Sequence, residues 1–245
     1  MFNKDILLRY SPQKNLKLNY KINYRVIGER SSLNILESTL DISTSYKVME
    51  NDNEKIKSEY YLDDIIFKSN NKEKGVSYKG DRLFLTLNQK NEVLERKSNI
   101  PSGIIEYISF VFPENKISMD EKFDGTFYVL FPNINRLIDV KGNITFEKFE
   151  GFKGYNCARL AFNFYPKILK LTDSYEQTLY GNGYMLYDIN FSILTFMTMN
   201  AFSDTGEVGL TFKSHFTKEL VPVKSPETKI SSEIMSTSDE YFIRY

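Results

Sequence analysis

One histidine, two acidic clusters and one cysteine are the side chains of this sequence that could take part in chemistry. His215 lies in the segment VGLTFKSHFTKEL and is the only histidine. A serine-hydrolase arrangement built on it would need a nucleophile, and no motif marks one. In a strand, His215 would share its face with the polar residues Lys213, Thr217 and Glu219. The pattern therefore favours a solvated strand residue over a catalytic base.

The acidic clusters are the pair Asp63 and Asp64 and the segment MDEKFDG (119–125). Paired carboxylates could serve glycoside hydrolysis, but surface turns commonly carry such pairs. The second cluster lacks the alternating ligands and the terminal glutamate of a calcium loop. An enzyme would need a cleft in which Asp63 or Asp124 converges with His215. We therefore predict a protein without catalytic residues, metal site or cofactor.

Two further motifs have simpler interpretations. Cys157, in YNCARLAF, is the only cysteine, which excludes an intramolecular disulfide and any site with several cysteine ligands. A buried structural thiol is favoured there over a nucleophile. GNG (181–183) is followed by a further expected strand and not by the helix that a phosphate loop needs, so we interpret it as a turn.

Charge and the N-terminus limit the partners and the compartment. The chain has 32 basic and 32 acidic residues, so no overall field favours nucleic acid or an anionic membrane. The apolar run Ile6–Leu8 is too short for the core of a signal peptide. We expect the periplasm or cell envelope if a leader has been replaced by Met1, and the cytoplasm otherwise.

The most apolar stretch, GYMLYDINFSILTFMTMNAF (183–202), has the length of a transmembrane helix but the periodicity of a strand. Its odd positions from Met185 to Ala201 are apolar except for Thr195, and most of its polar residues stand at even positions. Asp188, near the middle, would also cost roughly 2.5–3.5 kcal/mol in a membrane helix. We therefore reject a transmembrane segment and predict a hairpin turn at DINFS (188–192), or else a bend in one long strand.

Alternation of the same kind predicts strands along most of the chain, and the 17 tyrosines and 19 phenylalanines favour them. LKLNYKINYRV (16–26) alternates throughout, which is typical of a half-buried antiparallel strand. One helix is predicted over 101–112, where apolar residues recur at helical spacing, Ser102 can cap the start and Pro113 ends it. Further strands are predicted near residues 40–50, 56–68, 76–79, 82–97, 123–131, 137–149, 155–165, 174–187, 193–203 and 207–220.

The chain resembles itself at an offset of about 100 residues. YKVMENDNEKIKSE (46–59) aligns with FEKFEGFKGYNCAR (146–159), and 83–93 aligns with 183–193. We predict one β domain over 1–221, made of two related halves (about 6–98 and 113–220) joined by the helix 101–112. A polar C-terminal tail follows over 222–245.

The segment 184–202 is partly apolar on both faces, whereas an antiparallel sheet usually keeps one face wet. Either the protein itself, such as the helix 101–112, covers the second face, or an apolar ligand or partner does. Flexible methionines suit an apolar guest of variable shape. The candidate ligand-binding residues are Met185, Tyr187, Phe191, Ile193, Met197, Met199, Ile104 and Ile108.

Four segments together resemble a group of bacterial envelope proteins with a duplicated LolA/LppX-like fold. They are LLRYSP…LKLNY, FPENKISMDEKF, GFKGYNCARLAF and GNGYMLYD. The resemblance implies a strongly curved antiparallel sheet, an unclosed barrel, with a helix packed in its concavity. In the better-known members of the group this concave face carries lipid or lipoprotein acyl chains. The resemblance implies no catalytic residues.

These observations predict a mainly β protein with a large curved antiparallel sheet and one short helix. Its predicted function is non-enzymatic binding of an apolar, lipid-like ligand in the concavity of the sheet, in the bacterial envelope. This hypothesis requires an apolar pocket of several hundred Å³ against 184–202. The alternative is a structural or protein-interaction module of the envelope with a self-filled core and no ligand, recognised by an exposed apolar patch or an open edge strand.

Overall fold

A computed structural model describes most of the chain. The described residues are 5–30, 34–52, 54–69, 72–74, 80–98, 110–131, 136–172, 175–204 and 212–223. Within these ranges the regular structure consists of strands, which confirms the mainly β class. The strands are β1 (Lys17–Arg30), β2 (Asn34–Asn51), β3 (Ile56–Ser69), β4 (Lys72–Lys74), β5 (Arg82–Leu87), β6 (Val93–Ser98), β7 (Lys122–Phe131), β8 (Arg136–Phe152), β9 (Tyr155–Phe164), β10 (Lys167–Thr172), β11 (Tyr175–Asp188), β12 (Ile193–Asp204) and β13 (Phe212–Val223).

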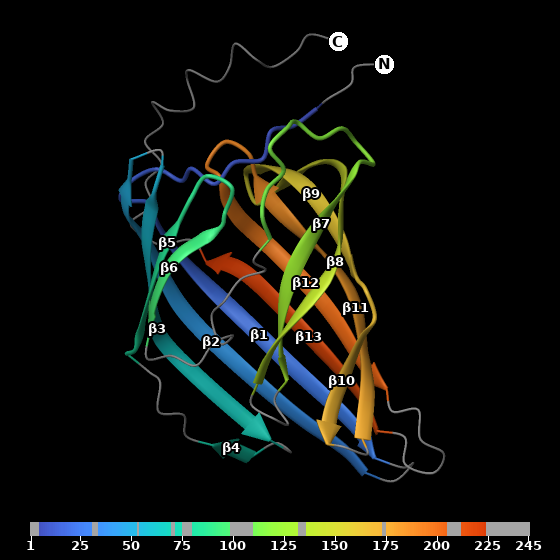
Figure 1. The fold of residues 1–245 in the computed structure, drawn as a ribbon. Coiled ribbons are helices and arrows are strands. Elements are labelled where there is room, and N and C mark those ends of the chain that lie inside the picture. The colour runs from blue at the N-terminus through green and yellow to red at the C-terminus, as the bar shows by residue number, and fades with distance from the viewer. Residues whose placement is uncertain are drawn as a thin grey trace.

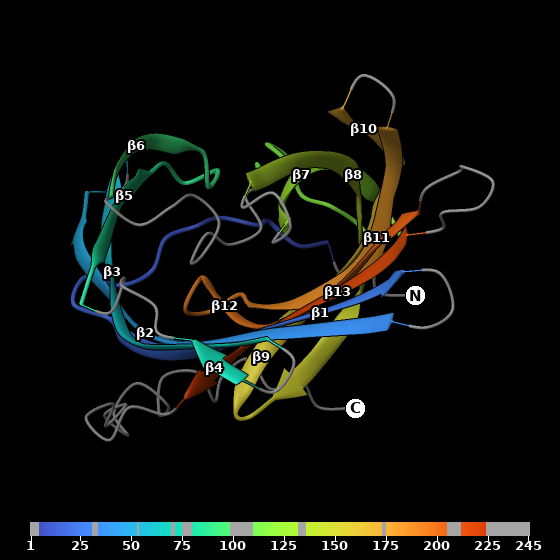
Figure 2. The ribbon, with the colours of Figure 1, turned by 90° about the horizontal axis from the view of Figure 1, so that it is seen from below.

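The strands form one strongly curved antiparallel sheet (Figure 1). Its order is β6-β5-β3-β2-β1-β13-β12-β11-β9-β8-β7, with β4 beside β3 and β10 beside β11. Seen from below, the sheet curls so far that its two edges, β6 and β7, lie on the same side of the molecule (Figure 2). The two edges are not paired with each other, so the barrel is unclosed, as predicted.

Two meanders, each made of strands consecutive in the sequence, meet at the centre of this sheet. Strands β1 to β6 run from the centre to one edge, and β7 to β13 run from the other edge to the centre. The long pair β1–β13 joins them, from Asn19 opposite Val223 to Arg30 opposite Phe212. The duplication of the two halves stays a prediction, and residues 224–245 of the predicted tail lie outside the described part.

Buried and exposed residues alternate along the strands, which places the hydrophobic core on the concave face of the sheet. In β1, Leu18, Tyr20 and Ile22 are buried, whereas Lys17, just before them, and Lys21, between Tyr20 and Ile22, are exposed. The other long strands repeat this pattern and contribute to a single hydrophobic cluster.

The apolar stretch 183–202 is a hairpin, which confirms the prediction from its sequence. Strand β11 ends at Asp188 and β12 begins at Ile193. A register shift beside Leu186 and Tyr187 leaves Thr195 without a directly opposite residue. The described residues include no helix that is long and apolar enough to span a membrane.

One local prediction needs correction, and another is mostly untested. Residues 101–109 of the predicted helix lie outside the described part, so the helix stays a prediction there, and its last residues, Phe110–Phe112, are not helical. Phe110 and Phe112 are buried in the core, 4% and 2% exposed. GNG (181–183) is not a turn but the middle of β11, paired with Met199–Ala201 of β12.

The N-terminal segment, residues 5–16, crosses the upper end of the sheet (Figure 1) and links the two meanders. Ile6 exchanges two backbone hydrogen bonds with Ile117, just before β7. The backbone N–H of Tyr10 donates to the carbonyl of Gln89, in the turn between β5 and β6 (2.8 Å). The Arg9 guanidinium donates to the carbonyls of Leu8, Pro113 and Glu114 (2.7, 2.8 and 2.6 Å).

Candidate functional site

A pocket opens on the concave face below the N-terminal segment. Its volume is about 60 Å³. Five tyrosines supply much of its wall: Tyr10 from the N-terminal segment, Tyr20 from β1, Tyr46 from β2, Tyr60 from β3 and Tyr187 from β11. The remaining wall consists of Leu87, Asn91, Phe110, Phe112, Met185, Ile193 and Leu194.

The tyrosine hydroxyls bond mainly to the protein, so the pocket presents ring faces. Tyr10 and Tyr46 share a hydrogen bond between their hydroxyls. Tyr20 donates to the carbonyl of Leu194 (3.1 Å), and Tyr187 donates to the carbonyl of Arg9 (2.7 Å). The rings also pack on one another, as in the pair Tyr46 and Tyr60, whose centroids are 4.8 Å apart. Ring packing and hydroxyl bonds together hold the wall in place.

The described wall of the pocket is uncharged. None of the described lining residues carries a charge. Burial raises the pKa of Tyr10 to about 12. Burial also raises the pKa of Tyr20, Tyr46 and Tyr187 well above 10.0. The hydroxyls therefore stay protonated through the physiological pH range, and the pocket suits apolar or neutral groups.

Three of the sequence-predicted site residues line this pocket: Met185, Tyr187 and Ile193. Met197 and Met199 are buried on the same face but belong to the solid core. Phe191 is half-buried in the β11–β12 turn, edge-on to the Tyr155 ring (6.3 Å). The other two, Ile104 and Ile108, lie outside the described part.

Sequence reasoning missed the tyrosines that the first meander supplies. Tyr20 and Tyr46 were expected only as core residues on alternating strands, and Tyr10 precedes the first strand. The sequence contained a usable signal, because Tyr20 stands on the inward face of its strand between the aliphatic residues Leu18 and Ile22. A buried tyrosine needs a partner for its hydroxyl, so it marks a place where polar and apolar groups meet.

The concave face of the second meander is filled by aromatic rings. Phe127 stacks on Phe162 and Phe164 with centroids 4.8 and 4.9 Å away. Phe127 and Phe162 are at most 1% exposed. The pocket therefore lies between the first meander and the β11–β12 hairpin. It is smaller than the several hundred Å³ expected, because aromatic side chains of the second meander fill a neighbouring part of the concavity.

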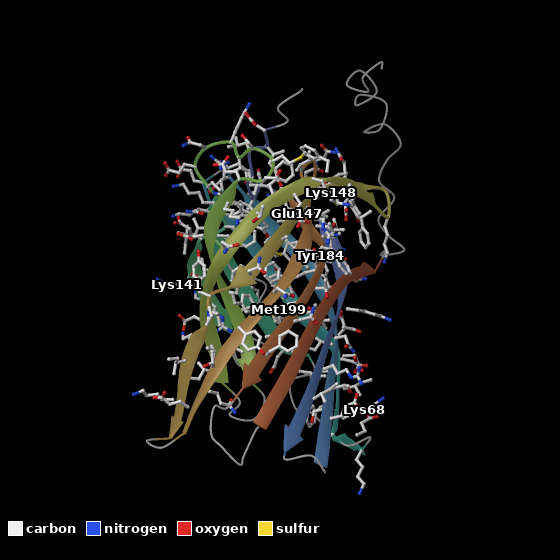
Figure 3. All side chains as sticks on the ribbon, turned by 90° about the vertical axis from the view of Figure 1, so that its right-hand side faces the viewer. Lys68, Lys141, Glu147, Lys148, Tyr184 and Met199 are labelled. Carbon is white, nitrogen blue, oxygen red and sulfur yellow. The ribbon has the colours of Figure 1, made fainter. Side chains whose placement is uncertain are left out.

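The opposite, convex face of β11 and β12 is covered in part by the protein itself. Leu186 is buried, and the Phe196 ring lies 5.4 Å from Phe152 and 5.5 Å from Tyr184. The Arg159 guanidinium lies 3.6 Å from the centroid of the Tyr184 ring. Figure 3 shows Tyr184 close to Glu147 and Lys148 on this face.

The two acidic groups considered for chemistry lie on different strands of the sheet. Asp63 on β3 accepts a hydrogen bond from Ser45 (2.6 Å), whereas Asp124 is on the edge strand β7. Nothing is described of the His215 side chain. Within the described ranges no three His, Cys, Asp or Glu side chains are grouped as metal ligands would be.

Cys157 is expected to be unreactive in the folded protein. Its thiol is buried, its Sγ lies 3.2 Å from Thr195 Oγ1, and burial raises its pKa to about 11. Because the thiolate is the reactive species, a thiol reagent at about pH 8 should label the native protein at least about a hundredfold more slowly than the denatured protein. Mass spectrometry of both samples over time measures this, and equal rates would contradict the burial.

Comparison with known proteins finds structures of similar fold but no matching protein family. No protein-family model and no curated protein sequence matches the chain. A solved structure of lipovitellin, concerned with its lipid–protein interactions, superposes with a TM-score of 0.53 at 7% identity. The match covers 86% of this chain and 25% of lipovitellin, so the chain spans about a quarter of that protein's length.

Two shorter proteins match over most of their length but with poor superposition. A protein from Parabacteroides distasonis with a provisional lipoprotein assignment has 13% identity, coverage of 89% and 98% of the two chains, and a TM-score of 0.32. A LolA superfamily protein from Nitrosomonas europaea has 8% identity, coverage of 85% and 87%, and a TM-score of 0.21. At 7% identity the likeness to lipovitellin concerns the fold alone.

Proposed function

We propose that this protein is a non-enzymatic binding protein that holds an apolar, lipid-like ligand on the concave face of its sheet. The observation that carries the proposal is the uncharged, ring-lined pocket among Tyr20, Tyr46 and Tyr187. Lipovitellin, whose solved structure concerns lipid–protein interactions, lends support through its fold. The proposed location of the protein is the bacterial envelope, which the resemblance of its sequence to envelope proteins implies.

The size of the pocket determines which part of a ligand it holds. A single water needs about 10–15 Å³ by the same measure, so about 60 Å³ accommodates roughly five water-sized groups. That is the end of an alkyl chain or a small ring. Each buried CH₂ contributes about 0.8 kcal/mol, so chains of similar length are expected to bind with similar affinity.

A structural or interaction module is the second candidate, and a specific observation favours it. The stacked rings Phe127, Phe162 and Phe164 show that much of the concavity is self-filled. At the same time Val93 and Leu94 of the edge strand β6 are 47% and 50% exposed. In this alternative the edge would pair with another protein.

Organic extraction of the purified protein, followed by mass spectrometry, separates the two candidates. A stoichiometric apolar compound in the extract supports the binding protein and identifies the ligand class. An empty extract, together with no thermal stabilisation by added alkanols, fatty acids or phospholipids, favours the structural module.

Filling the pocket should abolish binding. Leu194→Trp places an indole where the half-buried Leu194 now lines the pocket, and is expected to weaken binding of the neutral fluorescent probe N-phenylnaphthylamine by about tenfold or more. Leu94→Trp, the same change on the exposed part of β6, is the control and should leave the affinity unchanged. Equal affinities for the two variants in a fluorescence titration would place the probe elsewhere.

A further inference from the structure

Three buried hydroxyls next to the pocket share a single hydrogen bond. Tyr10 and Tyr46 bond to each other, and Ser58, 1% exposed on β3, has no hydrogen-bond partner. Ser58 is two residues from Tyr60, which stands opposite Tyr46 in the sheet. The Ser58 hydroxyl lies close enough to Tyr10 to offset a small part of the rise in the Tyr10 pKa that burial causes.

This cluster retains unused hydrogen-bonding capacity. When one hydroxyl donates to another, the accepting hydroxyl still has its own proton to donate. The Ser58 oxygen next to Tyr10 can accept one further proton, so a chain of the three hydroxyls uses two of their three protons and leaves one hydroxyl proton without an acceptor among the described residues. A buried hydroxyl without a partner is costly, and such a group in a native protein usually meets a water or a ligand. Both tyrosines line the pocket, so a ligand oxygen there would be within their reach.

The described surroundings disfavour a charged oxygen. Among the residues that the structure describes, no pocket-lining side chain is a cation. The adjacent Arg9 guanidinium donates to the three carbonyls of Leu8, Pro113 and Glu114, and so points toward the backbone of another segment. A carboxylate moved into this apolar wall would lose its hydration without a counter-charge, which is much more costly than burying a neutral oxygen that accepts a hydrogen bond.

We propose that the ligand of this pocket is a neutral amphiphile: an apolar end packed against Met185 and Ile193, with one hydroxyl or carbonyl oxygen that accepts a hydrogen bond from the pair Tyr10 and Tyr46. Alkanols and esters fit this description, and free fatty acids do not. This inference rests on the proposed function and specifies its ligand class.

Competition against the bound fluorescent probe tests the inference on the full chain. Dodecanol and methyl dodecanoate are expected to displace the probe at concentrations about tenfold below those needed for dodecanoate at about pH 8. Dodecane has no oxygen, so the difference between the affinities for dodecanol and dodecane measures what the hydrogen bond adds to the hydrophobic contribution. The ratio of dodecanol affinity to dodecane affinity should exceed one in the wild type.

Two matched variants locate the hydrogen bond. Tyr46→Phe removes one oxygen of the cluster and should reduce the dodecanol-to-dodecane ratio by about fivefold. Tyr165→Phe removes an exposed tyrosine hydroxyl outside the pocket, which donates to Asp124 (3.3 Å), and should leave the ratio unchanged. Thermal unfolding of both variants verifies that they fold.

The outcomes distinguish this inference from the proposed function. If dodecanol, dodecane and dodecanoate compete equally well, or if Tyr46→Phe leaves the ratio unaltered, the protein still binds apolar ligands and the neutral-oxygen inference is overturned. If neither the probe nor any of these compounds binds, the proposed function itself fails, and the inference fails with it.

Discussion

Replacing Gly183 with alanine is expected to lower the free energy of unfolding by about 3 kcal/mol and the melting temperature by roughly 6–12 °C. Gly183 stands in the middle of β11, opposite Phe162 of β9 and Met199 of β12. An added Cβ would lie 2.1 Å from the backbone oxygen of Thr198 and 2.6 Å from the Phe162 ring. Because one of these atoms is backbone, rotation of a side chain cannot relieve the contact, and β11 and β12 must separate.

Gly151→Ala is the matched control, because it makes the same change in a strand where there is space. The nearest atom to an added Cβ at Gly151, on β8, is the Tyr155 carbonyl oxygen at 4.0 Å. This variant should stay within about 0.5 kcal/mol of the wild type. Urea unfolding of the three proteins measures both effects. Equal midpoints for the two variants would show that the Phe162 ring does not lie over Gly183 as described.

The glycine pair also shows where sequence reasoning failed. Gly181 and Gly183 were interpreted as a turn, because GNG is followed by a further expected strand and not by the helix of a phosphate loop. The structure instead uses them to admit the rings of Phe164 and Phe162 from the neighbouring strand. Two glycines two residues apart stand on the same face of a strand, as do Phe162 and Phe164. That shared spacing was visible in the sequence, but which strand lies next to β11 was not.

Local patterns were sufficient for most of the long strands, although β10 was not predicted and the predicted strand 76–79 lies outside the described part. Alternation in 16–26 identified β1 and its inward face, and the Asp and Asn of 188–192 identified the turn that separates β11 from β12. Both features depend on residues within a few positions of each other. Backbone and side-chain preferences act at that range, so a single sequence contains the information.

The pocket could be predicted only in part because it is made by segments that are distant in the sequence. Met185, Tyr187 and Ile193 come from the predicted hairpin, but Tyr10 and Tyr60 reach the same pocket only through the full order of the sheet. Periodicity distinguishes inside from outside. Periodicity does not show which inward side chains contact each other and which leave a space between them. The packing of these side chains determines where a ligand can bind.

The second large effect is expected at Asp188, where alanine should cost about 3 kcal/mol of unfolding free energy. The fully buried Asp188 carboxylate organises the β11–β12 turn by accepting three backbone hydrogen bonds. They come from Asn190 and Phe191 within the turn (2.9 and 2.6 Å) and from Asn156 at the start of β9 (2.9 Å). Alanine leaves all three donors without this acceptor.

The loss should extend to the pocket, because Ile193 and Leu194 follow this turn directly and line the pocket wall. We expect Asp188→Ala to weaken probe binding as well as stability. Asp124→Ala is a suitable control, since Asp124 accepts only a long hydrogen bond from Tyr165 (3.3 Å) at an exposed site. Asp124→Ala should change neither the free energy of unfolding nor the affinity for the probe. If it lowers both as much as Asp188→Ala does, the turn has no special part in stability or binding.

The pH dependence of the conservative variant Asp188→Asn tests the electrostatics of the same carboxyl. Burial raises the pKa of Asp188 above 3.8, despite its three backbone donors. Between about 3.8 and this raised value, the unfolded chain has lost the proton that the folded protein still holds. The wild-type free energy of unfolding therefore falls as pH rises through this window.

Asparagine has no such titration, so the advantage of the wild type over Asp188→Asn should be greatest below about pH 4 and smaller near neutral pH. Urea unfolding of both proteins at several pH values measures this difference. An advantage that instead grows with pH would mean that the three N–H donors stabilise the carboxylate by more than burial costs it. The turn would then be held by a charge, and its strength would be lost on acidification together with the pocket wall that follows it.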